Sequence, residues 1–319
     1  MVQKQGVISL GEALIDFIPL DEQDEMFQKC PGGAPANVAV GLARLGLAST
    51  FAGKLGDDVL GRYLKDTLKA FGVNTNEIVL TNEAKTAIVF VTLGEDGERS
   101  FEFYINPSAD QLLNPEDLQE SLFTSHRVLH FGSISMIHPE ARRATTHAIE
   151  RAKANGLFIS FDPNVRLGLW ESEEECRERI LQTLNEAHLV KVSEEEVEFL
   201  TGEAEISAGV AKLKDYSWDV LVVTKGAAGS EVFTKHEHRT VSAEMVEAVD
   251  TTGAGDAFVS ALLYKAHEHP GGPTAMTADD WAEAARTASL SGGMAAATKG
   301  AMTALPTIQQ LEDRQEERS

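Results

Sequence analysis

The residues best suited to chemistry lie near the end of the chain, in the segment Asp250–Phe258. Gly253, Ala254 and Gly255 are small enough for their backbone N–H groups to converge, and an apolar helical run follows them. A helix N-terminus adds positive potential there, which suits a transferring phosphoryl group. Asp256 falls in the predicted first turn, where its carboxylate could accept a proton from an attacking hydroxyl. The pattern predicts phosphoryl transfer to a hydroxyl; the alternative is a glycine turn whose aspartate only stabilises the helix start.

Two other nucleotide-binding patterns do not fit this sequence. A dinucleotide-binding turn needs a third glycine where Phe258 stands, and it opens the first strand–helix–strand unit of a chain. A Walker-type loop needs serine or threonine after Gly-Lys, but Gly53-Lys54 is followed by Leu55. We therefore expect neither a dinucleotide-dependent enzyme nor a Walker-type NTPase.

Short apolar runs alternate with longer segments of helical periodicity along most of the chain. This alternation is typical of parallel strands whose connecting helices cover a sheet. The segments that carry it are Val7–Leu10, Pro35–Leu45, Thr50–Gly53, Val59–Phe71, Val128–Phe131, Glu140–Asn155, Phe158–Asp162, Leu189–Val192, Val197–Leu200, Val220–Thr224, Ala257–Lys265 and Asp280–Ala297. We expect a single doubly wound α/β domain over residues 1–319, with frayed chain only at Glu312–Ser319.

One stretch interrupts this alternation. Thr86–Leu93 and Arg99–Tyr104 are strand-like runs joined by Gly94-Glu95-Asp96-Gly97 without a helix between them, which predicts a hairpin. Together with the segment that follows Glu12, it would form a small sheet, with lid strands at about residues 12–30 and 86–106. A small sheet apart from the main body is suited to cover a substrate.

The composition restricts the partners of the chain. Its 319 residues include 50 acidic and 28 basic side chains, which gives a net charge of −22. This charge disfavours nucleic acid and anionic membranes, so an anion site must be built locally from backbone dipoles, a few cations and Mg²⁺. Cys30 and Cys176 are the only cysteines, which favours a reducing cytoplasm. No signal-peptide core and no apolar run of about 18 residues occurs, so we expect a soluble cytoplasmic protein.

Two separate signatures resemble those of the ribokinase-like carbohydrate kinases, the PfkB family. Asp250–Phe258 matches the C-terminal signature, and the N-terminal one matches Gly32–Ala39 with Leu42–Gly46, followed by Gly56-Asp57-Asp58 and Gly61. The fructokinases of this family are similar to the chain in the segments Gly11–Phe17, Asn106–Asp110, His130–Ser135, Asp162–Arg166 and Leu167–Trp170. The resemblance covers residues 6–308. It implies a three-layer ribokinase-like fold with a small β lid, ATP as the phosphoryl donor, and Mg²⁺ and K⁺ as metal ions.

The resemblance implies a sugar site formed by Asp16, Gly32, Gly33 and Asn37. The glycines permit a sugar to lie against bare backbone, Asn37 offers a donor and an acceptor, and Asp16 accepts hydroxyl hydrogen bonds. Arg166 is a planar, charged donor expected to touch the sugar or the moving phosphate. The alternatives are glycines that only turn the chain, an Asn37 that caps a helix, and an exposed ion pair for Arg166.

A strand and glycine turn similar to Val220–Gly229 lies along ATP in the family. The match implies nucleotide contacts for Thr224, Gly226 and Gly229. Lys191 is expected near the phosphates, unless it is simply solvated.

Metal contacts are implied in two places. Ser193 and Glu196 match the Asn-x-x-Glu element that lies near Mg²⁺ and phosphate in the family, with serine replacing asparagine. A run of glutamates that opens a helix is equally explained by the helix dipole. A K⁺ ion is implied beside the anion hole, near Asp250, Thr252 and the Lys299-Gly300 turn.

Three residues depart from the family pattern. Ile105 stands where similar fructokinases place an arginine, in the lid strand expected to face the sugar. Lys225 replaces a small apolar residue, and Ser289 stands where an asparagine often borders adenine. The lost arginine removes one expected polar contact with the sugar.

The resulting hypothesis is a fructokinase that transfers the γ-phosphoryl group of ATP to fructose, at O6, with Asp256 as base. A kinase of 2-keto-3-deoxygluconate or another sugar is an alternative, although a sugar acid would want a cation where Ile105 stands. A non-catalytic sugar-binding sensor is a second alternative, but sensing needs no base beside an anion hole. The free strand edges of the lid predict a homodimer.

Overall fold

The main sheet follows the predicted alternation of strands and helices. The computed structural model describes residues 4–21, 23, 25–93 and 99–317. In this part of the chain, nine strands form one sheet in the order β13-β12-β11-β10-β9-β8-β1-β4-β5. Their bounds are β1 Val7–Leu10, β4 Ser49–Gly56, β5 Ile78–Thr81, β8 Val128–Gly132, β9 Phe158–Asp162, β10 Leu189–Ser193, β11 Val220–Thr224, β12 Ser230–Thr234 and β13 His238–Val241. The pairings from β5 to β11 are parallel, whereas β12 and β13 add an antiparallel edge that the sequence pattern did not predict.

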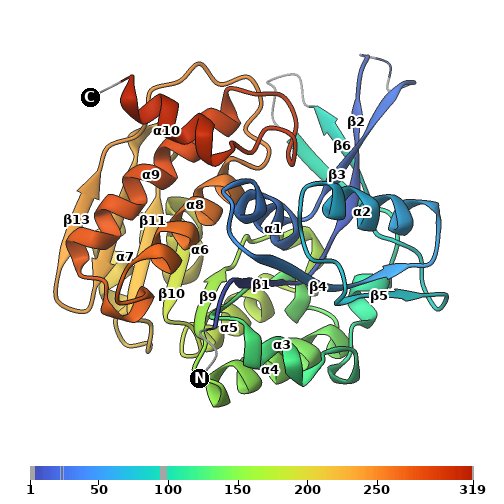
Figure 1. The fold of residues 1–319 in the computed structure, drawn as a ribbon, viewed down its shortest axis with the longest axis horizontal. Coiled ribbons are helices and arrows are strands. Elements are labelled where there is room, and N and C mark those ends of the chain that lie inside the picture. Colours follow the sequence, from blue (N-terminus) through green and yellow to red (C-terminus); the bar gives the residue numbers. More distant parts are fainter. Residues whose placement is uncertain (1–3, 22, 24, 94–98, 318–319) are drawn as a thin grey trace.

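Helices cover both faces of this sheet (Figure 1). Val7 and Ile8 are adjacent on β1 and belong to the two opposite cores, because successive strand side chains point to opposite faces. One core packs against α4, α5, α6 and α7, and the other against α1, α8, α9 and α10. The helix bounds are α1 Ala34–Arg44, α2 Val59–Ala70, α3 Glu120–Ser125, α4 Pro139–Ala154, α5 Glu173–Thr183, α6 Glu194–Thr201, α7 Ile206–Leu213, α8 Ala254–Glu268, α9 Ala278–Ala296 and α10 Ile308–Glu316. Short 3-10 segments are η1 Ala109–Leu112, η2 Pro115–Asp117, η3 Ile134–Met136, η4 Leu167–Leu169, η5 Gly226–Ala228 and η6 Pro273–Ala275.

The predicted lid sheet is present and stands at the upper right of the main body in Figure 1. Its described strands have the order β3-β2-β6-β7, with bounds β2 Leu14–Pro19, β3 Phe27–Gly32, β6 Ile88–Leu93 and β7 Arg99–Phe103. β6 and β7 pair antiparallel, as the predicted hairpin requires. The turn Gly94-Glu95-Asp96-Gly97 lies outside the described residues.

Asp58 connects the lid to the main body. Its Oδ1 accepts hydrogen bonds from the backbone N–H groups of Leu60 and Gly61 at 3.0 and 2.8 Å, which caps the start of α2. The same carboxylate accepts from the backbone and the hydroxyl of Thr86, at 2.9 and 3.0 Å, just before β6. One side chain therefore fixes both a helix start and the base of the lid.

The end of the chain is more ordered than predicted. α10 continues through Glu316, so the expectation of frayed chain from Glu312 is wrong for the described residues up to 317. Thr307 caps this helix, accepting from the backbone N–H of Gln310 at 3.3 Å, and Leu311 is buried in the core. Among the described residues, every helix is too short or too polar to cross a membrane.

Candidate active site

The carboxyl ends of the parallel strands carry the predicted site. β1 leads to Glu12, and β9, β10 and β11 end at Asp162, Ser193 and Thr224. In doubly wound sheets, ligands bind outside these ends, because the loops there leave a crevice. The sheet thus brings together residues that are far apart in the sequence.

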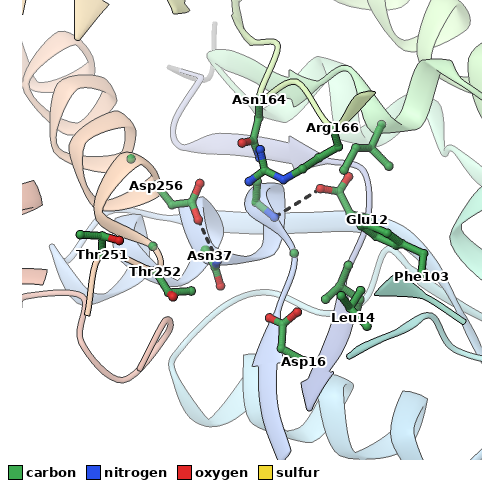
Figure 2. Close-up of a pocket in the computed structure, with 16 residues that line it drawn as sticks. Glu12, Leu14, Asp16, Asn37, Phe103, Asn164, Arg166, Thr251, Thr252 and Asp256 are labelled. Carbon is green, nitrogen blue, oxygen red and sulfur yellow. Dashed lines mark hydrogen bonds between the residues drawn. The ribbon is translucent and has the colours of Figure 1, made fainter. Parts of the chain in front are cut away.

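A cavity of about 430 Å³ lies between the lid sheet and the N-termini of α1 and α8. Figure 2 shows its polar side chains converging from these elements. Most residues predicted for sugar binding and catalysis line it: Asp16, Gly33, Asn37, Arg166, Gly253, Gly255 and Asp256. Thr252, which was predicted for K⁺, also lines it.

The two glycines allow close approaches in this cavity. A Cβ atom on Gly32 would lie 2.2 Å from Oδ2 of Asp16, so glycine leaves room for that carboxylate. Gly33 has a φ of +102°, and a Cβ atom there would lie 2.5 Å from the carbonyl oxygen of Glu12. Gly33 lines the cavity, whereas Gly32 acts by making space for Asp16.

Asn37 joins the two helix starts. Its Nδ2 donates a hydrogen bond to Oδ2 of Asp256 at 2.7 Å (Figure 2). Its Oδ1 is buried and has no hydrogen-bond partner among the described residues. Gly33, and not Asn37, is the N-cap residue of α1. Asn37 therefore orients Asp256 and presents an acceptor to the cavity.

The start of α8 has the features of an anion hole. Gly253 is the N-cap residue with a φ of 79°, and it makes no side-chain cap. The first N–H groups of a helix lack intrahelical partners, and here Gly253 and Gly255 line the cavity. Nζ of Lys191 lies 3.7 Å from the position that a Cβ atom on Gly255 would take. The structure thus brings an ammonium group to the predicted anion hole, beside Gly255 in the first turn of α8.

Two carboxyl groups of this cavity have raised pKa values. Burial raises the pKa of Asp256 to about 6; the hydrogen bond from Asn37 opposes this rise, and the negative charge of Asp162 adds to it. Burial likewise raises the pKa of Asp16 to about 6, although Arg166 opposes the rise. At neutral pH, both carboxylates are ionised but are better bases than exposed aspartates.

Lys191 is held by the end of the neighbouring strand. Its Nζ forms an ion pair with Oδ2 of Asp162 at 3.2 Å, and both side chains are nearly buried. Burial lowers the pKa of Lys191, but Asp162 and Glu196 outweigh that effect and raise it above its ordinary value. The ammonium group therefore stays charged beside the anion hole.

A second cavity of about 400 Å³ lies on the other side of the α8 start. Thr224, Gly226 and Gly229, the residues predicted for nucleotide binding, line it together with Ser289. Its other walls are mainly apolar and include Met245, Val246 and Phe258, which suits a flat heterocycle. Lys225 turns away and pairs with Glu231 at 2.7 Å. The two cavities share Thr251 and Gly255, so they meet at the anion hole.

Ser193 and Glu196 form a capping box at the start of α6. Oε2 of Glu196 accepts from the backbone N–H of Ser193 at 2.8 Å, and Oγ of Ser193 accepts from that of Glu196 at 3.2 Å. Oε1 of Glu196 accepts from the backbone N–H of Val165 at 2.7 Å. Both residues line a third cavity, of about 630 Å³, with Lys191 and Arg166. Glu196 therefore fixes the loop that carries Arg166, and each of its oxygens already accepts a hydrogen bond.

Asp250 brings together the segments predicted near K⁺. Its Oδ1 accepts from the backbone N–H of Thr252 at 2.9 Å, and its Oδ2 accepts from that of Gly300 at 3.1 Å. The side chain is buried. Asp250 thus fixes the loop that precedes the anion hole.

The sequence did not identify several residues of the cavity between the lid and the starts of α1 and α8. Glu12, Phe103 and Asn164 line it, and Asn164 has a φ of 45°, which is unusual for a residue other than glycine. Glu12 and Asn164 stand inside quoted family segments, which was the only signal for them. The expectation that Ile105 lies in the lid strand is wrong, because β7 ends at Phe103; the backbone N–H of Tyr104 still donates to the carbonyl oxygen of Ile88 at 3.1 Å, and Ile105 follows it.

Known proteins resemble the chain over nearly its whole length. The model of the pfkB family carbohydrate kinases matches residues 4–308. A probable fructokinase-4 of Arabidopsis thaliana is 43% identical over 318 residues, which cover 97% of this chain and 96% of the plant protein. The crystal structure of the Xylella fastidiosa fructokinase with bound ATP is 36% identical, has a TM-score of 0.93, and matches across 99% of this chain and 100% of its own. The Vibrio cholerae O395 fructokinase, solved with fructose, ADP and a calcium ion, is 39% identical with a TM-score of 0.89, over 96% of this chain and 97% of its own.

These likenesses confirm the predicted ribokinase-like fold. The chain belongs to the pfkB family of carbohydrate kinases.

Proposed function

We propose that the chain is a fructokinase that transfers the γ-phosphoryl group of ATP to O6 of fructose. The observation that carries this proposal is the meeting of two cavities at Gly255, with Asp256 on the sugar side. The names of the similar plant and bacterial proteins support fructose as the sugar and ATP as the donor. The experiment below also identifies which hydroxyl of fructose is phosphorylated.

The sugar side supplies acceptors and a base. Asp16 and Oδ1 of Asn37 accept hydroxyl hydrogen bonds, and Asp256 takes the proton of the attacking hydroxyl. That oxygen forms the new bond to the γ-phosphorus while the bond to the bridging oxygen of ATP breaks, and ADP leaves. The side chain of Asn37 holds the carboxylate of Asp256 in place throughout.

The anion hole and nearby cations stabilise the phosphoryl group in transit. The backbone N–H groups at Gly253 and Gly255 face the moving charge, whereas that of Ala254 donates to the carbonyl oxygen of Thr251 at 3.2 Å. Lys191 and Arg166 add positive charge from the adjoining walls. These groups are already in position, so little reorganisation is needed when the transition state forms. The nucleotide occupies the cavity lined by Thr224, Gly226 and Gly229.

Mg²⁺ and K⁺ would be bound at different places in this site. Among the described residues, no group of three acidic, histidine or cysteine side chains gathers to bind a metal. Each oxygen of Glu196 accepts one backbone hydrogen bond and keeps a second lone pair, so we propose that Glu196 lies near Mg²⁺ while it also fixes the loop of Val165. We expect Mg²⁺ to be bound through the phosphate oxygens of ATP, as is usual for this ion, and to neutralise their charge. Asp250 and Thr252 border the loop where we propose K⁺.

A panel of sugars tests the proposed function. Fructose, glucose, ribose and 2-keto-3-deoxygluconate are each supplied with ATP and Mg²⁺, and ADP release is measured. We expect the highest kcat/KM for fructose and a product phosphorylated at O6, identified by phosphorus NMR. A higher kcat/KM for another sugar would contradict fructose as the substrate, and ATP turnover by none of them would contradict the kinase activity.

The lid sheet supports a second proposal, that of a homodimer. Rings of Phe17 and Phe90 stack at 5.2 Å on this sheet, and Leu20, Met26 and Tyr104 are exposed around them. β3 and β7 are the outer strands, and unpaired strand edges favour association. Light scattering at micromolar concentration should give twice the mass of one chain, and a monomeric mass would reject the dimer.

A cytoplasmic location is proposed on the same basis as the sequence prediction. Cys30 and Cys176 are both buried free thiols, which a reducing compartment preserves. Cell fractionation with an antibody against the chain should recover it with cytoplasmic markers, and recovery with secreted proteins would contradict this location.

A further inference from the structure

Glu12 has a carboxyl oxygen that the fold leaves unpaired inside the sugar cavity. The residue follows β1 and its side chain is only 3% exposed. Oε1 accepts a hydrogen bond from the backbone N–H of Ala34 at 3.3 Å, which supports the start of α1. Oε2 is buried and has no hydrogen-bond partner among the described residues, although Glu12 lines the cavity (Figure 2). A buried polar atom without a partner is costly, so this one points to a ligand.

The surroundings of Glu12 favour its neutral form. Burial is the main cause that raises its pKa to about 8, and the negative charges of Asp110 on η1 and Asp256 on α8 add to the rise. The backbone N–H groups of Glu12 and Ala34 oppose it. Asp16 on β2 and the cationic Arg166 line the same cavity. At neutral pH, Glu12 therefore carries a proton, and a protonated carboxyl group has an O–H to donate.

The cavity has donors at Arg166 and Asn164, and acceptors at three other side chains. Asp16, Asp256 and Oδ1 of Asn37 accept hydrogen bonds, while the Nδ2 group of Asn37 already donates to Asp256. A sugar hydroxyl both donates and accepts, so its oxygen needs a donor on the protein. We propose that Glu12 is a further sugar-binding residue, whose protonated Oε2 donates a hydrogen bond to one hydroxyl oxygen of the sugar. This role rests on the proposed sugar kinase function.

The first test is the pH dependence of kcat/KM for fructose. For the parent, we expect a fall of about tenfold per pH unit above about pH 8, because ionised Glu12 loses its donor. Glu12→Gln keeps the size, the acceptor for Ala34 and an N–H donor at every pH, so the alkaline fall should disappear. Persistence of the same fall in Glu12→Gln, or its absence in the parent up to about pH 9.5, would overturn the proposal.

Asp110→Asn is the matched control. Oδ1 of Asp110 is also buried without a partner among the described residues, but Asp110 is not part of the described cavity lining. This variant should keep the alkaline fall and move it to lower pH, because one negative charge that raises the pKa of Glu12 is removed. Loss of the fall in Asp110→Asn, with its retention in Glu12→Gln, would assign the titration to Asp110 and overturn the role of Glu12.

Deoxy analogues of fructose distinguish a sugar contact of Glu12 from its support of the start of α1. Analogues of fructose that each lack one hydroxyl are compared in the parent and in Glu12→Leu, after circular dichroism has shown that the variant is folded. One analogue should lose about 5–50-fold in kcat/KM with the parent and much less with Glu12→Leu, because its missing hydroxyl is the one that Glu12 contacts. Equal losses for every analogue in both proteins would leave Glu12 only as a support for α1.

Different results would refute the proposed function and the proposed role of Glu12. If Glu12→Leu does not fold, the pH profile of Glu12→Gln still decides the role of Glu12. A parent that phosphorylates no sugar would refute the proposed function and the role of Glu12 together. A parent that turns over fructose, with an unchanged alkaline fall in Glu12→Gln, would refute the role of Glu12 alone.

Discussion

Replacing Asp256 with asparagine should abolish most of the activity and stabilise the protein. Burial raises the pKa of this carboxyl group from 3.8 to about 6 in the folded chain. A group with a raised pKa contributes most to stability below its unfolded pKa, and that contribution is lost as the pH rises through its folded pKa. At about 1.4 kcal/mol per pKa unit, ionised Asp256 costs up to about 3 kcal/mol above pH 6. The substituted amide would never ionise and would still accept the hydrogen bond from Asn37.

The activity of Asp256→Asn should fall about 10²–10⁴-fold in kcat, the usual cost of losing a general base. Coupled ADP release measures the rate, and urea denaturation at pH 8 and pH 4 measures the stability. Asp66→Asn, on the exposed face of α2, is the control for the substitution itself. The gain in stability should be present at pH 8 and should nearly vanish at pH 4. A variant with near-parent turnover, or one that is less stable than the parent at pH 8, would refute this account of Asp256.

Three further perturbations test separate parts of the structure. Potassium should raise kcat over sodium after thorough desalting, because a cation beside Asp250 would order the loop before the anion hole; equal rates would count against it. Asp58→Ala should lower the free energy of unfolding by about 2–3 kcal/mol in urea, since it removes the cap of α2 and the bonds to Thr86, while Asp58→Asn should lose less. Phe103 lines the cavity, so Phe103→Ala should raise KM for fructose about tenfold with little change in kcat. Ile105 lies beyond the lid strand, so Ile105→Ala should leave KM nearly unchanged. A similar rise of KM in both variants would contradict the boundary of the lid.

The start of α8 was predictable because its pattern lies in one continuous segment. Gly253 is the N-cap residue of α8 and Asp256 lies in its first turn, and the proposed anion hole and base follow from that local pattern. The alternating apolar runs also predicted the parallel strands and the helices that cover them. Local patterns of this kind carry their own structural information, since they depend on backbone conformation and side-chain periodicity.

Hydrogen bonds between residues far apart in the sequence could not be predicted from local patterns. The hydrogen bond between Asn37 and Asp256 joins residues 219 positions apart, and only the fold shows that the amide group is already engaged. Glu196 was predicted near Mg²⁺, and only the fold shows that its two oxygens also accept hydrogen bonds from backbone N–H groups, one of them at Val165 on another loop. The antiparallel edge and α10 were missed because their runs are short and their burial comes from neighbours distant in sequence.

In the described part of the chain, folding leaves some polar atoms of the proposed sugar cavity without hydrogen-bond partners. Most buried polar atoms in proteins find partners, yet Oε2 of Glu12 and Oδ1 of Asn37 lack them among the described residues and both belong to this cavity. The raised pKa values of Glu12, Asp16 and Asp256 have the same origin, since burial removes water without supplying enough donors. On the proposed function, a sugar would donate hydroxyl hydrogen bonds to Asp16 and to Oδ1 of Asn37, and would accept one from Glu12. Binding therefore relieves costs that the free protein bears, and fructose should raise the melting temperature in proportion to its affinity.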